Sequence, residues 1–182
     1  MGYVFTAYFL PVMLIAALGE GFTLARWQTW TAGPRGMMHF DLDQIVVFEV
    51  LRSASTGVIV CVCSYLVWLL REPFYARYDF EQAVVLVTYS LTPLFLCQIL
   101  SGVPRINLWV SWGIGVFFSL RVFYPGARYL AKTVPGSVVG LNAVSSVIII
   151  ALTGAQRFMI IQCLTGHGSS INYFIYDLAA KI

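Results

Sequence analysis

Charged side chains are scarce in this chain of 182 residues: Asp, Glu, Lys and Arg make up 10% of it, against roughly 25% in an average soluble domain. Hydrophobic residues make up 59%. The eleven basic and eight acidic side chains are scattered singly, so the sequence has neither the basic stripe of a nucleic-acid-binding protein nor an acidic tail. This composition predicts an integral membrane protein whose surroundings are the lipid bilayer, with no nucleic-acid partner.

Motifs of catalysis and of metal binding are also missing. The sequence contains no G-x-S-x-G, H-E-x-x-H, P-loop or dinucleotide fingerprint. His39 and His167 have no His or Cys at ligand spacing, and all four cysteines lie in apolar runs, where thiols behave as small hydrophobic groups. We therefore expect a protein that is not an enzyme and binds no cofactor.

Long apolar segments dominate the sequence instead. Crossing about 30 Å of hydrocarbon takes roughly 20 apolar residues in a helix. The pattern predicts a single all-α membrane domain, a five-helix transmembrane bundle whose termini lie on opposite sides of the membrane. The expected spans are residues 3–24, 45–70, 82–102, 106–124 and 137–164, followed by a short tail, 165–182. The basic residues divide almost evenly between the two faces, so charge alone does not orient the bundle.

The third segment has a proline at its centre. Pro93 lacks a backbone N–H, and its ring clashes with the carbonyl of Tyr89, which predicts a kinked helix. The hydroxyls of Ser90 and Thr92 lie within a turn and can bind the freed carbonyls. Two interpretations follow: a structural kink that lets neighbouring helices pack around Tyr89, or a hinge that lines a small polar cavity.

Several stretches resemble a known family. "EQAVVLVTYSLTPLFL", a short loop with Pro104, an aromatic segment ending "FYPGARYL" and a final span with "SSVIIIAL" together resemble the Yip1-domain family of five-helix membrane proteins. Tyr89-Ser90-x-x-Pro93, in the middle of span three, is the most specific part of this resemblance.

The resemblance implies a cytoplasmic N-terminus and an extracytoplasmic C-terminus. Eukaryotic members bind Rab-type GTPases through their cytoplasmic parts and act in vesicle traffic. This chain begins at its first span and resembles the compact bacterial branch, which implies the bacterial inner membrane. It departs from the family at Pro125, between Tyr124 and Gly126, and we expect this proline to end the fourth helix.

Charged residues inside apolar segments suggest a polar site. Glu20, Glu49, Arg52 and Arg157 are expected near the same membrane face, and intramembrane charges are costly unless they are paired or functional. Glu49 and Arg52 are three residues apart and are expected to form an ion pair. The four groups either pair at the helix ends or form a pocket for an ion or a lipid headgroup.

Small and polar residues open the fifth segment. Gly136 and Gly140 form a G-x-x-x-G that allows close backbone approach, either within the bundle or between two copies of the chain. Asn142 and the serines after it are expected to form hydrogen bonds across helices.

Basic residues gather at the opposite face. Arg121, Arg128 and Lys132 form a candidate cluster that anionic headgroups would attract. The segment 71–78 adds two arginines and the aromatic residues Phe74, Tyr75 and Tyr78, which suggests a surface for a membrane-protein partner.

Two functions remain open from the sequence. The first is a non-enzymatic membrane organiser or adaptor of the Yip1 type. The second is a small transporter or lipid-handling protein with a polar intramembrane pocket.

Overall fold

The described residues of this computed structural model, 2–27, 42–102, 106–131 and 135–164, form helices and short turns, with no strand among them. The first helix passes from α1 through a π-helical turn, η1, into α2, and α4 continues into a 3-10 turn, η3. The elements are α1 (Gly2–Val4), η1 (Phe5–Phe9), α2 (Leu10–Trp27), α3 (Leu42–Leu69), α4 (Phe80–Cys97), η3 (Gln98–Gly102), α5 (Leu108–Ala131) and α6 (Pro135–Leu164).

Four of these helices are long and apolar enough to cross a membrane, and this is compatible with an integral membrane protein. The apolar stretches are Thr6–Thr23, Ile45–Leu69, Phe80–Leu100 and Ser137–Ile160. The predicted all-α class is confirmed for the described residues. α5 is a fifth long helix of 24 residues, but it is not among the four, because Arg121 and several weakly polar residues interrupt its apolar sequence.

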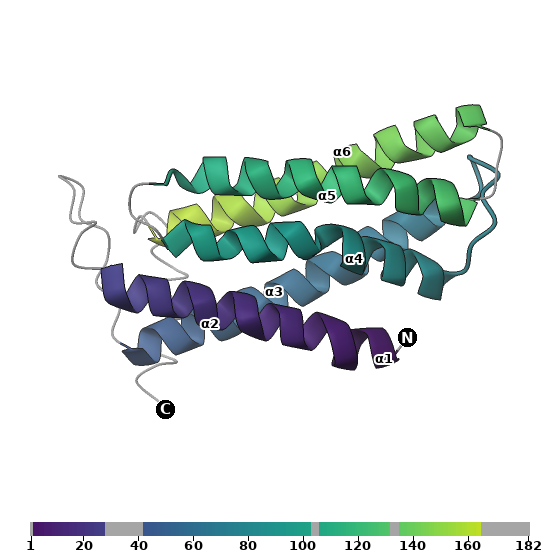
Figure 1. The fold of residues 1–182 in the computed structure, drawn as a ribbon. Coiled ribbons are helices and arrows are strands. Elements are labelled where there is room, and N and C mark those ends of the chain that lie inside the picture. Colours follow the sequence, from purple (N-terminus) through teal and green to yellow (C-terminus); the bar gives the residue numbers. More distant parts are fainter. Residues whose placement is uncertain (1, 28–41, 103–105, 132–134, 165–182) are drawn as a thin grey trace.

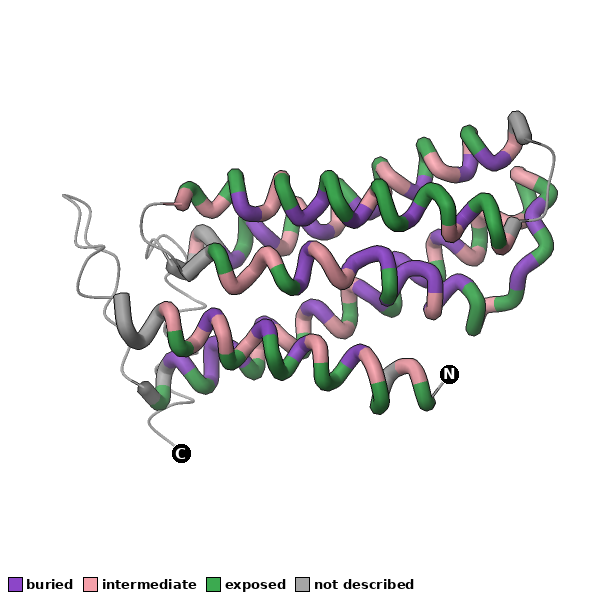
Figure 2. Tube along the Cα trace, in the orientation of Figure 1, coloured by how far each residue is buried: buried purple, intermediate pink, exposed green. Residues whose placement is uncertain are grey.

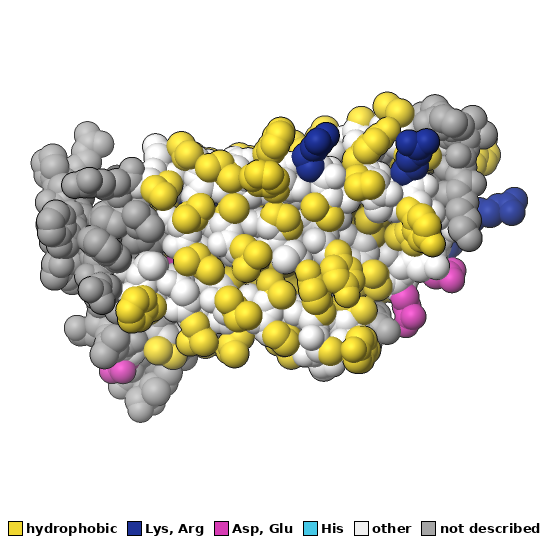
Figure 3. Space-filling view, viewed as in Figure 1, with side chains coloured by type: hydrophobic (Ala, Val, Ile, Leu, Met, Phe, Trp, Pro, Cys, Tyr) yellow, Lys and Arg dark blue, Asp and Glu magenta, His cyan; other side chains and the backbone are white. Residues whose placement is uncertain are grey.

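The long helices form an elongated bundle in which successive helices run in opposite directions (Figure 1). Buried residues line the inner sides of the helices, and exposed residues face outward (Figure 2). Hydrophobic side chains cover most of the face seen in Figure 3, whereas the charged side chains visible there lie mainly toward one end. A soluble protein rarely exposes so continuous an apolar surface, so this face is suited to contact with lipid.

The expectation that Pro125 ends the fourth helix was wrong. α5 continues through Pro125 to Ala131. Phe123 and Ala127, on either side of the proline, are buried in the core, and the side chain of Leu86 on α4 lies directly over Gly126. Tertiary packing on both sides therefore holds the helix together across the proline, although one backbone hydrogen bond is lost.

Pro93 is likewise an interior residue of α4. The helix continues to Cys97 before it narrows into η3. Thr92, next to the proline, donates its hydroxyl to the carbonyl oxygen of Thr88 over 3.2 Å. The predicted kink at Pro93 stays a prediction.

α4 and α5 approach each other closely at Gly115. A Cβ atom at this position would lie 2.9 Å from the Cα of Leu94 and 3.2 Å from the Cβ of Cys97. Real Cβ atoms do not approach a backbone atom so closely, so a side chain here would separate the helices. By contrast, a Cβ at Gly113 would meet no atom within 4 Å.

We predict that Gly115→Ala destabilises the bundle by about 1–3 kcal/mol, the usual range for overpacking, and that Gly113→Ala does not. The second variant is a matched control on the same helix, because Ala is favoured over Gly in helices by about 1 kcal/mol. Unfolding in detergent micelles, followed by circular dichroism, measures both. Equal stability of the two variants would contradict the close approach of α4 and α5.

Candidate functional site

The ends of five helical segments meet at one end of the bundle. They are the C-terminal ends of α2 and α6, the η3 turn after α4, and the N-terminal parts of α3 and α5. The four charged residues named from the sequence lie in this region, and all are buried: Glu20, Glu49, Arg52 and Arg157. We call these four residues the charged cluster.

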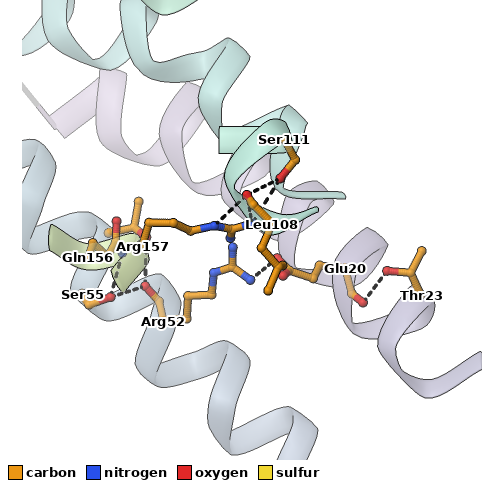
Figure 4. Close-up of polar contacts among 9 residues, drawn as sticks. Glu20, Thr23, Arg52, Ser55, Leu108, Ser111, Gln156 and Arg157 are labelled. Atoms are coloured by element: carbon orange, nitrogen blue, oxygen red, sulfur yellow. Dashed lines mark hydrogen bonds and ion pairs between the residues drawn. The ribbon is translucent and has the colours of Figure 1, made fainter. Parts of the chain in front are cut away.

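An ion pair between Glu20 and Arg52 links α2 to α3 (Figure 4). The two residues are only 2% and 4% exposed, so the pair lies away from bulk water. The expected ion pair between Glu49 and Arg52 is not among the contacts of the described residues, and Oε1 of Glu49 has no hydrogen-bond partner there. The guanidinium of Arg52 extends across the interface toward α2, where the carboxylate of Glu20 supplies the opposite charge.

Arg157 links α6 to α5. Its Nη2 donates to the carbonyl oxygen of Leu108 over 2.9 Å and to Oγ of Ser111 over 3.1 Å, and its Nε also donates to Leu108 O. Figure 4 shows this side chain extending from α6 toward the first turn of α5. Both acceptors of Arg157, a backbone carbonyl and a hydroxyl, are neutral groups.

Gln156 links α6 to α3. Its Nε2 donates to Oγ of Ser55 over 2.9 Å and to Oγ1 of Thr56 over 2.8 Å, while Thr56 donates to the carbonyl oxygen of Arg52. Gln156 and its partners were not predicted from the sequence. A signal was present, since Ser55 and Thr56 follow Arg52 by three and four residues and so lie on the same side of the helix.

A small cavity of about 20 Å³ lies beside these contacts. Arg52 and Arg157 line it, together with polar groups such as Ser111 and Gln156. This volume suffices for about one water molecule. Leu94 and Cys97 of α4 also line it, but Glu20, Tyr89 and Pro93 are not among the described residues that do.

Tyr89 lies on the outside of the bundle. The residue is 44% exposed, and its ring contacts the ring of Tyr8 at a centroid distance of 4.1 Å. The hydroxyls of Tyr8 and Thr92 are 2.9 Å apart and share a hydrogen bond, whereas the buried Oγ of Ser90 has no hydrogen-bond partner in the described part of the chain. Tyr8 on the first helix therefore packs against Tyr89, as the expected packing of neighbouring helices around this residue requires. The rest of Tyr89 is exposed on the outside of the bundle.

Gly140, the second glycine of the motif in α6, faces the loop between α3 and α4. A Cβ at Gly140 would lie 2.6 Å from Cε1 of Phe74, between α3 and α4, so this glycine makes room for an aromatic ring. The surroundings of Gly136 lie outside the described residues. Among the described residues, the buried Oδ1 of Asn142 has no hydrogen-bond partner, and Ser146 donates to the Asn142 carbonyl within α6. The cross-helix hydrogen bonds expected from Asn142 stay a prediction.

The candidate basic cluster lies on α5. Arg121 and Arg128 are exposed, as a role in binding headgroups requires. Lys132 and the tail, 165–182, fall outside the described residues.

The loop between α3 and α4 presents one aromatic residue outward. Phe74 packs over Gly140, and Tyr78 is buried and donates its hydroxyl to the Val67 carbonyl over 2.6 Å. Burial raises the pKa of Tyr78 to about 12, although the nearby charge of Arg71 acts in the opposite direction. Tyr75, in contrast, is 84% exposed and has a positive φ of 51°, a conformation uncommon for a residue other than glycine.

Among the residues that the structure describes, no group of three or more His, Cys, Asp or Glu side chains is placed to bind a metal ion. Comparison with protein-family models, with curated proteins and with solved structures gave no match. The chemistry of the site is therefore interpreted from its own residues.

We predict that Glu20→Gln destabilises the protein by about 3 kcal/mol, because it leaves the charge of Arg52 buried without its carboxylate. Glu72→Gln is the matched control, since Glu72 is exposed in the loop before α4, and it should change stability by less than about 0.5 kcal/mol. Thermal unfolding of both variants in the same detergent provides the comparison. A Glu20 variant as stable as the control would show that the ion pair does not support the fold.

Proposed function

We propose that this chain is a five-span, Yip1-like membrane protein that acts without catalysis, as an organiser or adaptor for another membrane protein. Tyr75 is the observation that supports this proposal most directly. It stands at the tip of the α3–α4 loop, 84% exposed, while its aromatic neighbours Phe74 and Tyr78 pack inward. Exposed tyrosines with arginines nearby are typical of residues that dominate binding energy at protein interfaces.

The backbone of the loop favours this presentation. The N–H of Tyr75 donates to the carbonyl of Glu72 over 3.1 Å, and the N–H of Ala76 donates to that of Arg71 over 2.8 Å. Arg71 lies over the ring of Trp68, with 4.4 Å between its guanidinium carbon and the ring centroid. These contacts order the backbone of the turn that carries Tyr75, so the loop itself need not become ordered when a partner binds, which lowers the entropy cost of association.

Five spans require that α5 also crosses the bilayer. It has 24 residues, about 36 Å of helix, and it packs between α4 and α6 along the bundle. Arg121, which interrupts its apolar sequence, can extend toward the interface through its long side chain. The Yip1 resemblance supplies the remaining elements of the proposal: an inner-membrane location, a cytoplasmic N-terminus and a bend at Pro93.

We expect Tyr75→Ser to lower the recovery of a membrane-protein partner in affinity purification from mild detergent by about thirtyfold, equivalent to the 2 kcal/mol of an interface hot spot. Tyr129→Ser is the matched control, because Tyr129 is 80% exposed on α5 and lies outside the loop.

Equal recovery with both variants would exclude the loop as the binding surface, and a tagged wild-type protein that retains no partner would exclude the adaptor role. The same tagged protein tests the topology. With five spans, tags at the two termini are accessible from opposite faces of the membrane.

A lipid-handling role is the second candidate, and one observation favours it: an apolar groove between α3 and α6 borders the charged cluster. The structure offers less support for a transporter. A transporter would need a polar space along the bundle, but the cavity at Arg157 has room for about one water, and Tyr89, beside the predicted hinge, is 44% exposed.

A further inference from the structure

A stripe of exposed side chains runs along the outer face of α5. Ile114, Phe117, Arg121, Tyr124 and Arg128 follow one another at alternating spacings of three and four residues, and each is exposed. This is the spacing by which two helices pack along a shared seam. We call these five residues the α5 ridge. It has the pattern of a helix interface, but no described helix covers it, because α4 and α6 pack against the other sides of α5.

The contacts between α4 and α5 give the depth of Arg121. Gly115 lies against Leu94, and Gly126 lies under the side chain of Leu86. The two helices run in opposite directions (Figure 1). Arg121 lies between the two glycines, so it is level with the part of α4 between the two leucines, around residue 90.

This level is the middle of a membrane span. The apolar stretch Phe80–Leu100 of α4 has its midpoint at Ser90. Arg121 is therefore about halfway through the ~30 Å hydrocarbon core, on the outside of the bundle. Arginine stays charged there, and a charge at this depth is costly unless it is paired. Extending the side chain shortens the distance to the interface but supplies no opposite charge, and no described residue forms an ion pair with Arg121.

The missing group is an anion that reaches the centre of the bilayer. A phospholipid phosphate lies at the membrane boundary, half the core away. A second copy of the described residues presents no such anion: Glu20 and Glu49 are buried, and the exposed carboxylates lie outside the apolar stretches or in the first turn of one. A carboxylate on the membrane-spanning helix of another protein can lie at this depth, and its two oxygens match the planar fork of arginine.

We propose that the α5 ridge binds a transmembrane helix of another protein, and that an Asp or Glu side chain at the middle of that helix pairs with Arg121. Phe117 and Tyr124, one turn to either side of Arg121, pack against the apolar residues that flank the carboxylate. This surface is separate from the loop that carries Tyr75. The proposal rests on the five-span topology proposed above, because α5 must cross the bilayer.

The test measures association between the full chain and a synthetic membrane-spanning peptide of leucine and alanine with one glutamate at its centre. Energy transfer between fluorophores on the two reports binding in phosphatidylcholine vesicles, in a mildly alkaline buffer that favours the ionised carboxylate. A peptide with glutamine in place of the glutamate is the control ligand. We expect the glutamate peptide to bind about tenfold more tightly, a ratio that corresponds to one charged hydrogen bond.

Two variants on the same helix locate the charge. Arg121→Leu should remove the preference for the glutamate peptide. Arg128→Leu is the matched control, because Arg128 is an exposed arginine about two turns nearer the end of α5, and it should keep the preference. Both positions are exposed, so neither substitution disturbs the packing of the core.

Equal binding of the two peptides to the wild type would overturn the proposal, and so would a preference that survives in Arg121→Leu. Loss of the preference when phosphatidylglycerol is added to the vesicles would assign Arg121 to a lipid phosphate instead. Energy transfer between two labelled copies of the chain that the glutamate peptide does not reduce would assign the ridge to self-association. Either of these results would also overturn the proposal.

The failure of this proposal can be told apart from failure of the proposed function. Tagged termini on opposite faces of the membrane, together with equal binding of the two peptides, would reject the α5 ridge and leave the five-span topology standing. Tyr75→Ser should bind the glutamate peptide as the wild type does, because the peptide has no part that reaches the α3–α4 loop.

Discussion

The requirement that a buried charge have a partner determines how one end of this bundle is assembled. Glu20 and Arg52 form an ion pair between α2 and α3 at exposures of 2% and 4%. Arg157 satisfies its guanidinium on α5, through Leu108 and Ser111. In lipid, bringing helices together gains little hydrophobic energy, so such polar contacts and close packing supply most of the specificity.

Close packing holds the rest of the structure. Along the α4–α5 interface, Gly115 brings the two backbones together at Leu94, and Phe123 and Ala127 are buried beyond it. These contacts stabilise α5 on both sides of Pro125, so the helix continues past it. The bundle thus combines a polar end, where charges join four helices, with an apolar middle in which small residues set the helix spacing. The α3–α6 groove lies where these two regions meet, which places an apolar wall beside Arg52.

The sequence predicted the helical class and five apolar spans, of which four are helices long and apolar enough to cross a membrane, and it identified the four charged residues, because length, hydropathy and isolated ionisable residues are local signals. It did not predict the partners. Arg52 pairs with Glu20, far away in the sequence, rather than with Glu49 one turn back, and Arg157 binds a backbone carbonyl, which has no residue type to reveal it. Pro125 was misjudged for a related reason: helix continuation there depends on contacts with α4 that only the folded bundle supplies.

The central claim is that Arg52 and Glu20 depend on each other inside the bundle, and a double-mutant cycle tests it most directly. The free energy of unfolding is measured in one detergent for the wild type, Glu20→Leu, Arg52→Leu and the double variant. We predict that the double variant is more stable than either single variant, because replacing both charges with apolar groups removes the unpaired charge. A double variant whose loss of stability equals the sum of the two single losses would contradict the account.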